Sequence, residues 1–260
     1  MAFAIANGVR LFYTDDGNGD AMLLVHGWGS DSHEWSPHIP VLARDRRVIA
    51  VDLRGHGYSA AYETGNTPRQ MAGDLAVLVA GLGIGSCVVI GHSMGGQIAS
   101  ILAVEHPDLV TALVAVDPGY GFPAAVAEAS LKMFRGRDPN EAAVDIDQWC
   151  YTAASPAWLR EWHRRRLLAT APHVLAEAFA ALWDGPEAIG VRPASDDYLS
   201  RRACPVLTFG SDPRRTGWES GLFKDPRSAA VTWPGSGHRL HEERPAEFLL
   251  VVNDWLRSLT

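Results

Sequence analysis

Short apolar segments alternate with helical segments along most of this chain, and this alternation limits the possible folds more than any other feature. Several apolar segments are continuous, such as Val88, Val89 and Ile90, a pattern typical of strands that are buried on both faces of a parallel sheet. Strands are predicted at residues 10–14, 21–25, 47–51, 87–90, 111–116, 205–209 and 229–233, and helices at residues 68–80, 95–105 and 245–259. We therefore expect an α/β fold with a doubly wound, mostly parallel sheet.

The alternation stops between residues 120 and 202. This segment has helical periodicity and little strand pattern, and it is too long for a loop inside a compact domain. We predict that residues 120–202 form a helical lid, inserted into a core domain of residues 1–119 and 203–260. The lid carries the tryptophans Trp149, Trp158, Trp162 and Trp183. Each of them fits either the lid's own core or the wall of a substrate site.

The net charge and the cysteine content indicate which binding partners and which cellular compartment to expect. A formal net charge of -7 makes the chain a poor candidate for binding a phosphate backbone. Its three cysteines are far apart and odd in number, as expected for free thiols in a reducing compartment. No apolar run reaches the ~18 residues needed to span a bilayer, and the N-terminus does not resemble a signal peptide. We expect a cytoplasmic protein with a small-molecule substrate, no nucleic-acid or membrane partner, and a homodimer as one option.

The strongest chemical motif is Gly91-His92-Ser93-Met94-Gly95. It matches G-x-S-x-G and lies between a predicted strand and a predicted helix, which is the context that this motif requires. A serine at such a turn projects its Oγ away from the sheet, and the glycines leave room for the sharp bend. Ser93 is therefore the predicted nucleophile, and His92 beside it is predicted to contact substrate.

A serine nucleophile needs a base and an oxyanion hole. His238 follows the last predicted strand in a Gly235-Ser236-Gly237 loop and is the predicted base, with His241 as its rival. The backbone N–H groups of Met94 and Trp28 are the predicted oxyanion donors, and Gly27 is expected to line the substrate site. The histidines lack zinc-ligand spacing and no glycine loop for phosphate is present, so we expect no metal and no cofactor.

Taken together, these residues resemble the α/β-hydrolase superfamily. The resemblance covers nearly the whole chain and is carried by segments 26–29, 52–59, 91–96 and 237–245 in the family's usual order. It implies the α/β-hydrolase fold with an acyl-serine mechanism. The lid segment 182–193 is also similar to that of the zearalenone-type lactone hydrolases, a likeness that implies substrate contact for Trp183.

The same resemblance leaves two choices for the acid of the catalytic triad. Asp212 follows the strand at 205–209, the commoner place in the family, although its turn is one residue shorter than usual. Asp117 follows the strand at 111–116, the place used by haloalkane dehalogenases and zearalenone-type lactonases. Both remain open, and we favour Asp117.

The predicted function is hydrolysis of a carboxylic ester or lactone of a hydrophobic small molecule through an acyl-serine intermediate. Two alternatives use the same residues: a C–C bond hydrolase, and a small-molecule receptor on a hydrolase fold with little turnover. Epoxide and haloalkane hydrolysis on this fold need a carboxylate nucleophile, and Ser93 argues against both.

Overall fold

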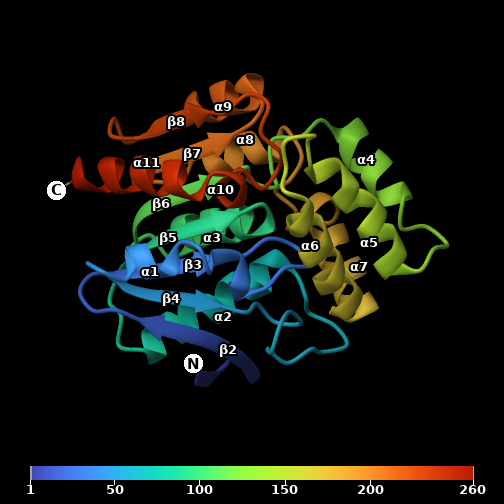
Figure 1. Cartoon of the computed structure of the whole chain (residues 1–260), viewed down its shortest axis with the longest axis horizontal. Helices are drawn as coiled ribbons and strands as arrows, with labels where there is room; N and C mark the ends of the chain where they lie inside the picture. Colours follow the sequence, from blue (N-terminus) through green and yellow to red (C-terminus); the bar gives the residue numbers. More distant parts are fainter. Residues whose placement is uncertain (1, 260) are drawn as a thin grey trace.

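The computed structural model describes residues 2–259. Within this range the chain forms an eight-stranded sheet in the order β1-β2-β4-β3-β5-β6-β7-β8 (Figure 1). The strands are β1 Ala2–Ala6, β2 Val9–Asp16, β3 Ala21–Val25, β4 Arg47–Val51, β5 Cys87–His92, β6 Val110–Val116, β7 Val206–Gly210 and β8 Ala229–Thr232. The pairs β1–β2 and β2–β4 are antiparallel, and all the other pairs are parallel. The expected mostly parallel sheet is confirmed.

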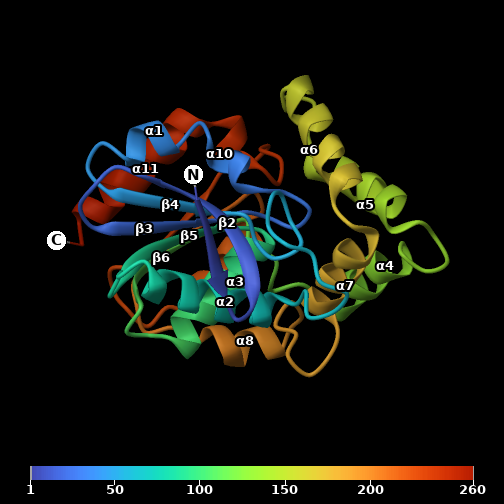
Figure 2. The ribbon, with the colours of Figure 1, turned by 90° about the horizontal axis from the view of Figure 1, so that it is seen from below.

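Helices cover both faces of the sheet because its central strands are apolar on both sides. Figure 2 shows α1 (Ile39–Leu42), α10 (Leu240–Glu243) and α11 (Pro245–Arg257) on one face, with α2 (Pro68–Gly81) and α3 (Met94–Glu105) on the other. Each face has its own buried apolar cluster. Burial of these clusters, worth about 25 cal/mol per Å² of apolar surface, stabilises the layered arrangement.

A change of winding direction at the centre of the sheet determines where a site can form. The chain passes from β3 outward to β4 on one side, and then returns to place β5 on the other side of β3. The loops that leave β3 and β5 therefore diverge at their carboxyl ends. Ligands of open α/β sheets bind at such a switch point, and Trp28 and Ser93 lie in these two loops.

Between β6 and β7 the chain forms a group of helices. They are α4 (Ala124–Lys132), α5 (Pro139–Asp147), α6 (Ala157–Ala169), α7 (Pro172–Trp183) and α8 (Ala194–Leu199), with a 3-10 turn at Gln148–Cys150. Figures 1 and 2 show α4–α7 beyond one end of the sheet, whereas α8 lies beside α3. The division of the chain at residues 120 and 202 stays a prediction.

Most elements end within two residues of the predicted bounds. The strands at 21–25 and 47–51 agree at both ends, and the predicted helix at 95–105 begins at Met94. Strand β1 was missed, because its alternating alanines have a weak strand propensity. The three cysteines are free, as predicted. None of the helices in residues 2–259 is long and apolar enough to cross a membrane, and the cytoplasmic location stays a prediction.

Candidate active site

Ser93 occupies a strained turn between β5 and α3. Its backbone has φ 53° and ψ -116°, a region that residues other than glycine rarely adopt. The turn is held by Ser93 N–H donating to Val116 O at 2.9 Å and by Gly119 N–H donating to Ser93 O at 2.9 Å. Because strain of this kind persists only where the surroundings impose it, the turn fixes the direction of Ser93.

Two glycines make this turn possible. A Cβ at position 91 would lie 2.1 Å from Gly95 O, and a Cβ at position 95 would lie 2.2 Å from Val25 O. Any side chain at either position would therefore collide with backbone. The sequence motif is thus a steric requirement of the close approach between β3, β5 and α3.

His238 and Asp117 are 121 residues apart in the chain but meet in the fold. His238 Nδ1 lies 2.6 Å from Asp117 Oδ2, and the ring of His238 is 4.7 Å from that of His92, next to Ser93. A quarter of the His238 side chain is exposed, and it lines the same cavity as Ser93. The imidazole is therefore held by a carboxylate at Nδ1 while its ring faces the region of the serine.

The other carboxylate oxygen of Asp117 accepts a hydrogen bond from Arg215. Arg215 Nη1–H donates to Asp117 Oδ1 at 3.1 Å, and its Nη2–H donates to Pro118 O at 2.6 Å. Sequence reasoning missed Arg215, which lies on α9 (Pro213–Ser220) and belongs to no motif. Only the fold brings it against the end of β6.

These contacts set the charges of the pair. Burial alone would raise the pKa of Asp117, but the Arg215 guanidinium and the hydrogen bond from His238 hold it below its ordinary value. Burial lowers the pKa of His238, although the hydrogen bond and the negative charge of Asp117 act to raise it. At neutral pH the pair is therefore a carboxylate beside a neutral imidazole, the state that a general base requires.

Asp212, the other candidate acid, has different partners. Its side chain accepts from Arg214 N–H at 2.9 Å as the N-cap of α9, and it pairs with the exposed Arg214 guanidinium at 3.2 Å. These hydrogen bonds from Arg214 lower the pKa of Asp212. Asp212 contacts the helix that it caps, whereas Asp117 is the carboxylate that contacts His238.

The predicted oxyanion donors lie on either side of Ser93. Met94 begins α3, where the first N–H groups of a helix have no partner within the helix. A Cβ on Gly27 would lie 3.4 Å from Ser93 Cβ, so the chain from Gly27 to Trp28 runs directly past the nucleophile. The Trp28 indole Nε1–H donates to Leu175 O of α7 at 3.0 Å. That bond ties the loop after β3 to the group of helices between β6 and β7.

A cavity of about 390 Å³ opens over Ser93. Gly27, Trp28, His92 and Trp183 line it, so the structure brings all the residues predicted to contact substrate to one place. Its apolar wall comes mainly from residues of the segment between β6 and β7: Phe122, Val126, Ile146, Phe179 and Leu182. The indole Nε1–H of Trp183 is buried and has no hydrogen-bond partner in residues 2–259.

His241 does not share the cavity with Ser93. His241 is fully buried, its Nε2 lies 3.3 Å from Glu34 Oε1, and its ring is tilted against that of Trp35. Burial lowers the pKa of His241 to about 3. Glu34 was also missed by sequence reasoning, because a lone glutamate after a glycine-rich loop resembles a surface residue.

Comparisons with known proteins agree with this geometry. The family model described as alpha/beta hydrolase fold matches residues 20–150. Among relatives, sn-1-specific diacylglycerol lipase ABHD11 of Xenopus tropicalis is 34% identical over 95% of this chain and 81% of that protein. A soluble epoxide hydrolase of Corynebacterium sp. (strain C12) is 39% identical over 56% of this chain and 54% of that protein. The matched parts span between 32% and 54% of the length of four such relatives.

Solved structures extend the likeness to the whole chain. A thermophilic esterase from Thermogutta terrifontis superposes with a TM-score of 0.84 and 26% identity, over 99% of this chain and 98% of that one. The chain belongs to the α/β-hydrolase family. The family hosts several chemistries, so the reaction has to be argued from the site.

Proposed function

We propose that this protein hydrolyses a carboxylic ester or lactone of a hydrophobic small molecule through an acyl-serine intermediate. The observation that carries the proposal is the contact of 2.6 Å between His238 Nδ1 and Asp117 Oδ2, beside a serine on a strained turn. The likeness to an esterase over nearly the whole chain supports it.

In the first half of the reaction, Ser93 Oγ attacks the substrate carbonyl and His238 Nε2 takes its proton. Asp117 keeps the remaining proton on Nδ1 and stabilises the imidazolium that forms. The developing oxyanion accepts hydrogen bonds from the backbone N–H groups of Trp28 and Met94. The tetrahedral intermediate then expels the alcohol, which takes the proton from His238.

In the second half, a water molecule gives its proton to His238 and attacks the acyl carbon of Ser93. The second tetrahedral intermediate breaks the bond to Ser93 Oγ, which recovers the proton, and the acid leaves. For a lactone, the alcohol and the acid are two ends of one molecule. The cavity must then hold both ends during the first half of the reaction.

The cavity wall supports a substrate with a large apolar part. Aromatic and aliphatic side chains of the segment between β6 and β7 line the cavity together with a smaller number of polar groups, the arrangement typical of small-molecule sites. The place of Trp183 in the cavity wall supports contact between this side chain and the substrate. This is the lid position that the resemblance to lactone hydrolases implied.

The test combines labelling with turnover. A fluorophosphonate probe should label the wild-type chain at one site, and p-nitrophenyl esters of increasing acyl length should be turned over many times. Ser93→Ala should lose both signals, whereas Ser36→Ala, with the exchange at an exposed serine, should keep both. Macrolactones and aryl esters in the same screen separate the substrate classes. Tight ligand binding that survives Ser93→Ala, without turnover in the wild type, would support a receptor instead.

A further inference from the structure

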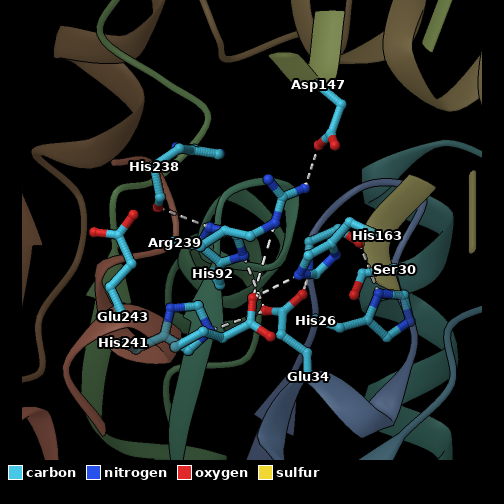
Figure 3. A network of polar contacts seen from close by, with 12 residues as sticks. His26, Ser30, Glu34, His92, Asp147, His163, His238, Arg239, His241 and Glu243 are labelled. Carbon is cyan, nitrogen blue, oxygen red and sulfur yellow. Dashed lines mark hydrogen bonds and ion pairs between the residues drawn. The ribbon is translucent and has the colours of Figure 1, made fainter. Parts of the chain in front are cut away.

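Three side chains from distant parts of the chain meet beneath the nucleophile. Glu34 follows β3, His92 ends β5 and His241 lies on α10, and each is at most 2% exposed. Their nearest ligand atoms lie within 4.8 Å of one another. Figure 3 shows the three side chains gathered together, with Arg239 and His163 nearby. The reaction proposed above uses none of these three side chains for proton transfer.

The hydrogen bonds around His92 leave one of its nitrogens without a use. His92 Nε2 lies 3.1 Å from the backbone oxygen of His238, which can only accept, so Nε2 carries a proton. In a neutral ring Nδ1 is then a bare lone pair. It lies 2.9 Å from Glu34 Oε1, which is also an acceptor, and two acceptors at this distance repel each other unless a positive group lies between them.

A proton does not fill this role well. Although Nδ1 and Oε1 are close, they do not meet with hydrogen-bond geometry, and both atoms are buried without a partner in residues 2–259. The two ring nitrogens of His241 are also buried without a hydrogen-bond partner in residues 2–259. His241 Nε2 lies 3.3 Å from the same Glu34 oxygen. Four buried polar atoms without a partner in one place are rare in folded proteins and need an explanation.

The spacing of these atoms suits a small cation. Ligands that surround a zinc ion tetrahedrally at about 2.1 Å lie about 3.4 Å from each other, close to the 2.9 and 3.3 Å from Glu34 Oε1 to His92 Nδ1 and His241 Nε2. Two imidazoles and a carboxylate are a preferred donor set for zinc. Glu34 and His92 also line the cavity over Ser93, so the cluster lies directly beside that cavity.

The surroundings orient the donors and offset nearby positive charge. Gly27 N–H donates to the other oxygen of Glu34 at 3.2 Å, and the His241 backbone oxygen faces His38 Nε2 at 3.1 Å. Outer contacts of this kind orient the ligands in metal sites. Arg239, the neighbouring cation, is paired with Asp147 at 2.5 Å, so its charge does not act on the three residues unopposed.

We propose that Glu34, His92 and His241 form a binding site for a divalent zinc-like ion that the sequence spacing did not reveal. The ion would join the segment after β3 to β5 and α10, next to the catalytic residues. His92 precedes Ser93 and donates to the His238 backbone, so the site would hold the serine turn and the histidine loop at a constant separation. This role is structural, and the ion takes no part in the bond changes at Ser93.

The test measures metal binding separately from activity. Tag-free full-length protein is stripped with a chelator and titrated with Zn²⁺ by equilibrium dialysis, with metal content read by mass spectrometry. We expect one tightly bound zinc per chain. Glu34→Gln and His241→Gln should each weaken binding at least tenfold, while His106→Gln, which changes an exposed histidine, should not. Ser93→Ala should bind zinc like the wild type, so this result is independent of the proposed hydrolysis.

Binding of Co²⁺ gives a second measurement that does not depend on the stability of a variant. The wild type should show the visible absorption bands of a low-coordinate nitrogen and oxygen site, and Zn²⁺ should remove them. Zinc that binds equally weakly to the wild type, Glu34→Gln and His241→Gln would overturn the proposal, as would its complete removal by dialysis against buffer. The three residues would then be a hydrogen-bonded cluster only.

Discussion

Replacing Asp117 with asparagine tests the proposed triad at its most specific contact. The change keeps the shape of the side chain but gives it one acceptor and one donor. Arg215 approaches Oδ1 and has only donors, so the amide oxygen must turn toward Arg215. The amide NH₂ then faces His238 Nδ1, at the position that the carboxylate oxygen holds at 2.6 Å.

This arrangement forces the wrong tautomer on His238. With a donor facing it, Nδ1 must be the bare nitrogen, so the single proton of the neutral ring moves to Nε2. The nitrogen that should take the proton of Ser93 is then already protonated. Loss of the correct tautomer in a serine triad lowers kcat about ten-thousandfold, which corresponds to about 5.4 kcal/mol of transition-state stabilisation.

The assay is steady-state hydrolysis of a p-nitrophenyl ester, with Asp212→Asn as the matched control. Asparagine caps a helix as well as aspartate does, so the control should keep the N-cap of α9 and stay within about twofold of wild-type kcat. Circular dichroism should show both variants folded. A kcat for Asp117→Asn above about a tenth of the wild-type value would refute the reasoning, and so would equal losses in the two variants.

Three further predictions follow from the site and its surroundings. Because burial lowers the pKa of His238, kcat/KM should fall with decreasing pH only below about pH 6.5, and an acid limb centred above pH 7 would contradict this. His56 is buried and its pKa is lowered to about 3, so on acidification the unfolded chain takes up the imidazole proton at a higher pH than the folded chain does. Urea titrations should therefore show the free energy of unfolding falling between about pH 6.5 and 4, by up to about 1.4 kcal/mol per pH unit. The fall should be smaller in His56→Gln. Trp149 is 69% exposed at the cavity wall, so Trp149→Ala should raise KM for long acyl esters about fivefold with kcat unchanged, whereas Trp158→Ala, which lies outside the cavity, should change neither value.

The sequence by itself determined the elements and the nucleophile. The apolar runs at 21–25, 47–51 and 87–90 can be buried on both faces only as central strands, and the G-x-S-x-G turn between a strand and a helix admits one backbone path. These features are local, because each depends on residues that are close together in the chain. The sequence alone is therefore enough to predict Ser93 and its turn.

The tertiary structure alone decided which side chains meet. Asp117 and Asp212 both follow strands, and only the placement of β6 and α9 shows that one contacts His238 while the other caps a helix. Arg215 against Asp117, and Glu34 between His92 and His241, join residues far apart in the chain. Contacts of this kind depend on how layers pack, and no local pattern encodes them.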